Sequence, residues 1–319
     1  MLELAYTFLL RIRRRNFNGK MLFYIRRALK LLVNIIYPIY YNIFPTSKTG
    51  ININKNESDE KIIISLTTFP ARINTVWLCI ETLLRQKKKP DEIVLWLADS
   101  QFESIDQLPK NLIKQQERGL TIKFCEDLRP HKKYYYTIKE NPNANVIIVD
   151  DDMYYPNFLV EMLIDKSKAY PGAIICNRGR FMKFNENNSI APYKLWTNNS
   201  DTNEPSYALC PIGCDGVLYP PNTLHLDVFN KDDIYNLCLN ADDLWLKLMS
   251  LRVNTKAVKT DVNMISFFDI ITTQKTKLTS LNVENDGNDI QMQNILKKYN
   301  IDFSDYNSNQ KQVEREGHE

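Results

Sequence analysis

The sequence has 319 residues, enough for one large domain with appendages and a substantial hydrophobic core. Hydrophobic residues make up 44% and charged residues 25%, which is ordinary for a soluble globular protein. The net charge is +3, but residues 1–50 carry nine Lys/Arg and the single acid Glu3, whereas the rest of the chain is net negative. Because a nucleic-acid binder usually carries basic charge across its folded face, this distribution argues against a nucleic-acid partner.

Residues 1–45 alternate apolar clusters with basic ones, and the run 31–44 holds no charge. That run is shorter than the roughly 20 residues that span a bilayer, and Pro38 interrupts it. No small-residue cleavage site follows, so we expect no secretory signal. Basic residues between aromatic ones suit a segment on an anionic membrane surface, and the alternative is a helical hairpin packed on the main domain. We predict residues 1–50 as this extension, on the cytoplasmic membrane face, and 51–60 as a polar linker.

From residue 61 the chain alternates predicted strands and helices. Strands are expected at 62–66, 92–97, 121–124 and 146–149, and helices at 73–86, 108–118 and 132–140. This order indicates an α/β fold with a doubly wound, mostly parallel sheet and right-handed crossovers. Ligands of such sheets bind in the crevice beyond the carboxyl ends of the strands.

Three carboxylates, Asp150–Asp152, follow the fourth predicted strand directly. Carboxylates this close repel one another unless a cation neutralises them, and Mg²⁺ or Mn²⁺ is the usual partner, often shared with substrate phosphates. The alternative is an acidic turn whose Asp caps the next helix. No GxGxxG follows the first strand and no GxxxxGK[ST] occurs, so a nucleotide would be held by side chains and a metal ion.

The six cysteines are scattered among apolar neighbours, and no CxxC pair occurs. We therefore predict reduced, mostly buried thiols, as in a cytosolic protein. A disulfide between Cys210 and Cys214 stays open.

Five sequence blocks stand in one order along the chain: Ser65–Arg72, Asp127–Tyr134, Asp150–Pro156, Gly213–Pro221 and Ala241–Trp245. Together they resemble a bacterial GT-A-type nucleotide-sugar glycosyltransferase with a DxD motif, of the kind found in surface-polysaccharide biosynthesis. The resemblance covers about residues 61–300. We predict a GT-A domain at 61–303 and a polar tail at 304–319, which we expect to be disordered. One departure is Arg129, which stands where a glycine is expected before Pro130.

The resemblance implies a GT-A, Rossmann-like fold and a role for each matching residue. Asp150 would lie near the ribose and the metal ion, and Asp152 would reach the Mg²⁺ or Mn²⁺ that bridges the two phosphates. The remaining donor contacts would come from Thr67, Thr68, Arg72, Asp99, Lys133, Gly213 and Gly216. His131 and Lys132 lie beside Lys133 in sequence and leave its assignment open. Thr67, Thr68, Arg72 and Asp99 also have ordinary roles at strand ends, helix starts and turns.

Asp242 and Asp243 precede an apolar helical pattern. Two acids at a helix start interact favourably with the helix dipole and can cap the free N–H groups of the first turn. That role alone would explain both residues. The resemblance implies instead that Asp243 takes the proton of the acceptor hydroxyl, with Asp242 as a cap or an acceptor contact.

The sequence thus predicts a metal-dependent, inverting glycosyltransferase. Its donor would be a nucleoside-diphosphate sugar, a UDP-sugar in the first place, and its acceptor a glycan or lipid-linked glycan. The alternatives are a Mg²⁺-dependent nucleotidyl- or phosphotransferase and a non-catalytic carbohydrate-binding protein.

Overall fold

The structure is a computed structural model that describes residues 2–14, 19–54, 60–197, 204–261, 266–276, 286–301 and 303. The predicted tail 304–319 and residues 55–59 of the predicted linker lie outside the described residues.

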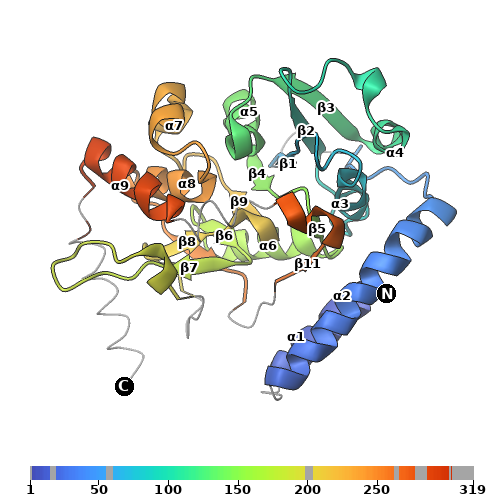
Figure 1. Ribbon diagram of the computed structural model, residues 1–319, viewed down its shortest axis with the longest axis horizontal. Helices are drawn as coiled ribbons and strands as arrows, with labels where there is room; N and C mark the ends of the chain where they lie inside the picture. The colour runs from blue at the N-terminus through green and yellow to red at the C-terminus, as the bar shows by residue number, and fades with distance from the viewer. Residues whose placement is uncertain are drawn as a thin grey trace.

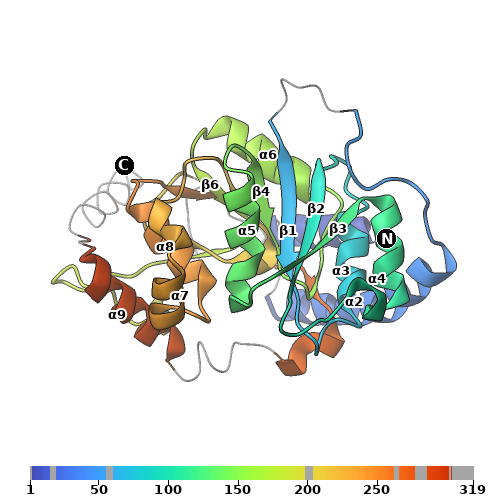
Figure 2. The same ribbon diagram turned by 90° about the horizontal axis from the view of Figure 1, so that it is seen from above.

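A seven-stranded sheet forms the centre of the molecule (Figures 1 and 2). Its strand order is β10-β6-β9-β4-β1-β2-β3, and β9 alone among these strands runs antiparallel to its neighbours. The strands are β1 (Ile62–Thr67), β2 (Glu92–Ala98), β3 (Leu120–Cys125), β4 (Asn145–Ile148), β6 (Ile174–Cys176), β9 (Val217–Tyr219) and β10 (Ala257–Lys259). The predicted α/β class with its doubly wound, mostly parallel sheet is confirmed.

Helices cover both faces of the sheet, because strands that are apolar on both faces must be buried on both. The helices that follow β1 in the described part of the chain are α3 (Val76–Leu83), α4 (Lys110–Lys114), α5 (Lys132–Glu140), α6 (Leu159–Ala169), α7 (Lys231–Leu237), α8 (Asp242–Leu251) and α9 (Gly287–Tyr299). Alternate residues of β1 point to opposite faces. Ile64 packs in one core with α3 and α6, and Ile63 packs in the other with α5 and α8.

Two short antiparallel pairs lie beside the main sheet. β5 (Met153–Tyr154) pairs with β11 (Phe268–Asp269), and β7 (Gly179–Phe181) pairs with β8 (Leu209–Pro211). Short 3₁₀ turns occur at 105–107, 115–118, 129–131, 193–195, 213–215, 226–229 and 271–276. Since β5 begins one residue after Asp152, the β5–β11 pair fixes the chain as it leaves the acidic trio.

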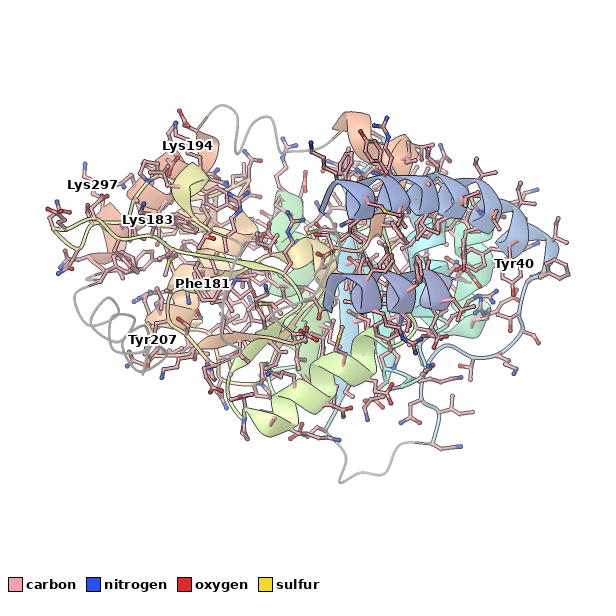
Figure 3. The ribbon with its side chains drawn as sticks, turned by 90° about the horizontal axis from the view of Figure 1, so that it is seen from below. Tyr40, Phe181, Lys183, Lys194, Tyr207 and Lys297 are labelled. Carbon is pink, nitrogen blue, oxygen red and sulfur yellow. The ribbon has the colours of Figure 1, made fainter. Side chains whose placement is uncertain are left out.

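The N-terminal segment forms two helices that lie side by side, α1 (Leu2–Arg14) and α2 (Gly19–Ile43) (Figure 3). Their inner sides are buried against the domain through Leu2, Tyr6, Leu9, Val33, Tyr37 and Tyr41. The Tyr6 hydroxyl donates to the Tyr154 carbonyl at 2.6 Å and accepts from the Phe268 amide at 2.7 Å. The structure therefore shows a helical hairpin packed on the main domain, which is one of the two alternatives that the sequence leaves for this segment.

We expect Tyr6→Phe to lower the free energy of unfolding by about 1–3 kcal/mol, because the buried Phe268 amide and Tyr154 carbonyl both lose a partner. Urea unfolding followed by circular dichroism measures the change. Tyr24→Phe is the matched control, since Tyr24 is 66% exposed. An equal effect of the two substitutions would contradict the role given to the Tyr6 hydroxyl.

Candidate functional site

A cleft of about 680 Å³ lies where the carboxyl ends of β1 and β4 meet the start of α8. Residues of the β1 exit, the Asp150–Asp152 trio, the start of α5 and the start of α8 line it. Neighbouring parallel strands end at the same edge of a sheet, so their exits bring polar residues together there. The sheet topology thus places the predicted acidic trio and the predicted acidic pair in one cleft.

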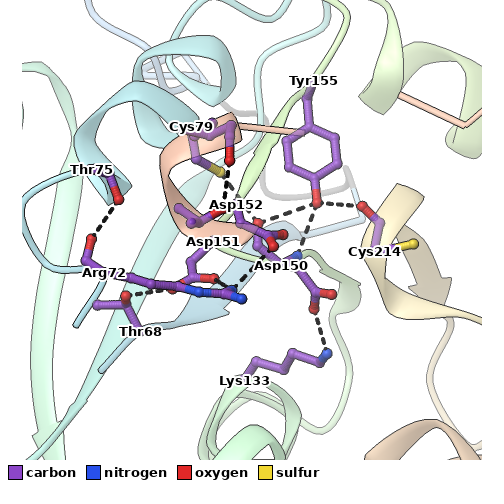
Figure 4. Close-up of polar contacts among 12 residues, drawn as sticks. Thr68, Arg72, Thr75, Cys79, Lys133, Asp150, Asp151, Asp152, Tyr155 and Cys214 are labelled. Carbon is purple, nitrogen blue, oxygen red and sulfur yellow. Dashed lines mark hydrogen bonds and ion pairs between the residues drawn. The ribbon is translucent and has the colours of Figure 1, made fainter. Parts of the chain in front are cut away.

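Asp151 and Asp152 share one cation (Figure 4). An Arg72 guanidinium nitrogen lies 2.5 Å from Asp151 Oδ1 and 3.3 Å from Asp152 Oδ2. The Thr68 hydroxyl donates to Asp151 Oδ2 at 2.5 Å. Burial raises the pKa of the Asp151 carboxyl, and Arg72 and Thr68 oppose that rise. Thr68 and Arg72 therefore hold the trio in place while they also line the cleft.

Lys133 connects the trio to the second acidic pair. Its ammonium lies 2.7 Å from Asp150 Oδ1 and 2.9 Å from Asp242 Oδ2, and the side chain is only 6% exposed. Burial disfavours the charge on Lys133, but Asp150, Asp242 and Asp243 outweigh it and raise the pKa above its usual value. The lysine therefore stays charged and binds carboxylates from two distant parts of the chain.

Asp243 approaches the glycine-containing loop that precedes β9. The Gly213 amide donates to Asp243 Oδ1 at 3.0 Å. A Cβ atom at position 213 would lie 2.9 Å from Lys133 Nζ and 3.3 Å from Asp243 Oδ1, so a side chain here would displace the Lys133 ammonium from its present position. Burial, followed by the charge of Asp242, raises the pKa of the Asp243 carboxyl, which Lys133 opposes. A carboxylate of raised pKa in a cleft is suited to accept a proton near neutral pH.

Neither acidic group caps a helix. Ala241 occupies the N-cap position of α8 and Phe158 that of α6, and no side chain caps either helix there. Helix capping therefore does not account for the trio or for the acidic pair. Both acids of the pair still lie in the first turn of α8, where the helix dipole favours them.

Tyr155 fixes the backbone of the trio. Its buried hydroxyl accepts from the Asp150 amide at 2.9 Å and donates to the Cys214 carbonyl at 2.8 Å (Figure 4). This single side chain joins the β4 exit to the 213–216 loop. The orientation of Asp150 therefore depends on a residue outside the DxD positions.

The carboxylates of Asp150 and Asp152 are hard oxygen donors of the kind that Mg²⁺ and Mn²⁺ prefer. Among the described residues, no group of three or more His, Cys, Asp or Glu side chains is arranged to hold a metal ion alone. Mg²⁺ commonly takes only one or two carboxylates and completes its coordination with phosphate oxygens and water. The Asp150 side chain is 34% exposed and the Asp152 side chain 8%, so Asp150 is the more open donor of the two for a metal ion that arrives with a diphosphate.

The other predicted donor contacts are placed differently. Thr67 lines the cleft, although its hydroxyl donates to the Trp96 carbonyl at 2.8 Å. Asp99 is exposed after β2 and is not among the described residues that line the cleft. Gly216 also lies outside that lining. Its φ is 88°, and a Cβ atom there would lie 3.0 Å from a Leu159 methyl carbon, so a turn explains this glycine.

The segment before α5 resolves two questions that the sequence left open. Arg129 has φ of 52°, so the backbone adopts the left-handed conformation that glycine favours even though a side chain is present. Lys132 pairs with Asp127, and His131 is buried with Nε2 2.7 Å from the Cys238 carbonyl. Burial lowers the pKa of His131 to about 4. Lys133 is thus the member of this group that contacts the trio.

Arg178, Arg180 and Tyr193 also line the cleft, although no sequence pattern placed them there. Arg178 lies 3.5 Å from Cys214 Sγ, and the Arg180 guanidinium lies 4.7 Å from the centre of the Tyr193 ring. The two arginines closely follow β6, so extending the strand-exit argument to that strand would have found them. Arg26 of α2 also lines the cleft, and only the tertiary structure brings it there.

No protein-family model matches the sequence, and no curated protein matches it. Among solved structures, the chain is similar to a 4-diphosphocytidyl-2C-methyl-D-erythritol synthase at a TM-score of 0.40 and 8% identity, over 65% of this chain and 92% of that one. It is also similar to a mannosyltransferase from Pyrobaculum calidifontis in complex with GDP-Man and Mn²⁺, at a TM-score of 0.31 and 12% identity. That match covers 55% of this chain and 47% of the other. At these scores neither likeness bears on function.

We expect Asp243→Asn to stabilise the protein at neutral and alkaline pH. The pKa of Asp243 is higher in the folded protein than in the unfolded chain. The stability linked to this carboxyl is therefore fully present at a pH below its pKa in the unfolded chain, and it is lost as pH rises through its pKa in the folded protein. The asparagine removes that loss. The gain in unfolding free energy should grow as pH rises from about 4 towards about 8 and should vanish below about pH 4.

Urea unfolding at a series of pH values, in the presence of EDTA, measures this gain. Asp99→Asn is the matched control for the loss of one exposed carboxylate. A gain that does not change with pH would contradict the raised pKa of Asp243.

Proposed function

We propose that this protein is a metal-dependent glycosyltransferase. It transfers a sugar from a nucleoside-diphosphate sugar, with a UDP-sugar as the first candidate, to a hydroxyl of a glycan or lipid-linked glycan. The place of this reaction in surface-polysaccharide synthesis rests on the sequence resemblance alone.

One observation supports the proposal above the others. Lys133 joins a carboxylate of the Asp150–Asp152 trio to Asp242, so the residues suited to a metal-bound diphosphate and those suited to proton transfer lie in the same cleft. A protein that only bound carbohydrate would not need buried carboxylates that repel one another. Such costly groups are characteristic of sites that perform chemistry.

The cleft residues account for each part of a single displacement. Asp243 accepts the proton of the acceptor hydroxyl, and the hydroxyl oxygen forms a bond to the anomeric carbon of the donor sugar. The bond from that carbon to the phosphate oxygen breaks, and the nucleoside diphosphate leaves with both electrons of the bond. Asp150 and Asp152 would hold Mg²⁺ or Mn²⁺, which supplies Lewis-acid stabilisation of the leaving diphosphate when bound. Inversion follows from a single displacement.

A panel of UDP-, GDP- and dTDP-sugars, incubated with the protein and Mn²⁺ or Mg²⁺, tests the proposal by release of nucleoside diphosphate. We expect release with at least one donor, abolition by EDTA and recovery on adding the metal ion back. Release of pyrophosphate would instead identify a nucleotidyltransferase. Glycan binding without release from any donor, with or without acceptors, would identify a carbohydrate-binding protein and contradict the proposal.

We expect Asp243→Asn to slow transfer by about 100-fold or more while it leaves donor binding intact, because a general base contributes about 10²–10⁴-fold to the rate. Asp152→Asn should instead weaken binding of UDP in the presence of Mn²⁺, measured by calorimetry. Asp242→Asn tests the other acid of the pair, and urea unfolding shows whether loss of its contact with Lys133 affects the fold. If neither substitution at the pair slows transfer in a protein that binds donor, the assignment of the base is wrong.

A further inference from the structure

The outward side of the N-terminal hairpin is apolar along almost its whole length. We call it the outer face; its exposed large side chains are Leu4, Phe8, Met21, Tyr24, Leu31, Leu32, Ile35, Ile39 and Ile43. Leu4 is 72% exposed and Ile35 is 62% exposed. Figure 3 shows α1 and α2 side by side across this side of the molecule, with Tyr40 towards one end of α2.

The spacing in α2 shows that these side chains form one ridge. Tyr24, Leu31, Ile35 and Ile39 recur at intervals of four or seven residues and lie opposite the buried Val33–Tyr37–Tyr41 row. The apolar residues on the packed side of α2 are covered by the main domain, whereas those on its exposed side would be removed from water only by a second apolar surface. Monomeric proteins rarely expose a continuous apolar surface of this extent.

The charge around the outer face is basic. Arg11, Lys20 and Arg27 are exposed on the two helices. Glu3 is the single acid of residues 1–50, and its carboxylate lies 2.6 Å from Lys87 and 2.9 Å from Asn157 of the main domain. An apolar ridge with Tyr and Phe side chains, flanked by Arg and Lys, complements an anionic lipid headgroup layer above its acyl chains.

Among the described residues, no helix is long and apolar enough to cross a membrane. We propose that the outer face docks on an anionic lipid bilayer, with α1 and α2 lying in the plane of the interface. The docking goes beyond the transfer reaction proposed above and does not depend on it.

The docked hairpin would hold the main domain in one orientation, because polar contacts tie it to β11. Lys30 lies 2.5 Å from an Asp269 carboxylate oxygen, and the Asn34 side-chain amide donates to the Asp269 carbonyl at 3.1 Å. Arg26 donates to the Phe267 carbonyl at 3.1 Å and also lines the cleft. The cleft would therefore lie beside the bilayer. If the proposed transfer reaction is right, this position suits an acceptor that the membrane itself carries.

Sedimentation with vesicles tests the docking. The full-length protein is mixed with vesicles of phosphatidylcholine alone and with vesicles that also contain phosphatidylglycerol. We expect binding to the anionic vesicles, and a loss of about tenfold or more in affinity for the double variant Ile35→Asp/Ile39→Asp. Leu226→Asp is the matched control, since Leu226 is 80% exposed on the main domain and should leave binding unchanged. Urea unfolding confirms that each variant is folded.

Two results would overturn the docking. One is equal, weak sedimentation with both kinds of vesicle. The other is a concentration-dependent dimer of the wild-type chain, seen by sedimentation velocity and absent from the double variant, which would make the outer face an interface between copies. Nucleotide release by the double variant is measured in parallel, so a failure of the docking is distinguished from a failure of the proposed reaction.

Discussion

The buried ammonium of Lys133 is the contact on which the site depends. It binds Asp150 on one side and Asp242 on the other, and Arg72 does the same for Asp151 and Asp152. Without these two cations, mutually repelling carboxylates would face one another in a partly buried cleft. Removing one partner of a buried pair costs about 3–5 kcal/mol, so both cations are part of the fold as well as of the site.

The fold brings these groups together because β4 ends, and α5 and α8 begin, at the same edge of the sheet. The exit of β4 supplies the trio, the first turn of α5 supplies Lys133, and the first turn of α8 supplies the acidic pair. Gly213 lets the loop before β9 approach both Lys133 and Asp243, and Tyr155 joins that loop to Asp150. The backbone around the carboxylates is thus held from two sides before any ligand arrives, as preorganised chemistry requires.

The hairpin is connected to the same site through the segment before β11. Arg26 binds the Phe267 carbonyl, and the Phe267 amide donates to the buried Asp215 carboxylate at 3.0 Å. Burial raises the pKa of Asp215 to about 6. Since Asp215 lies between Cys214 and Gly216, the loop that carries Gly213 is tied to the N-terminal helices. The extension is therefore a structural neighbour of the cleft, and its outer face is the part that the domain leaves uncovered.

The sequence by itself determined the strand-and-helix alternation from residue 62 to 149 and the clustering of polar residues at the strand exits, because burial periodicity and strand direction are local. It also singled out the acidic trio through residue type and motif order, but it left Lys133 undistinguished from its neighbours His131 and Lys132. It could not show that Arg72 binds Asp151, or that Arg178 and Arg26 reach the cleft, since these depend on which distant segments pack together. Nor could it choose between a segment on a membrane surface and a hairpin packed on the domain. The tertiary structure shows the packing, which buries one side of each helix and leaves the other uncovered, because these contacts join segments far apart in the chain.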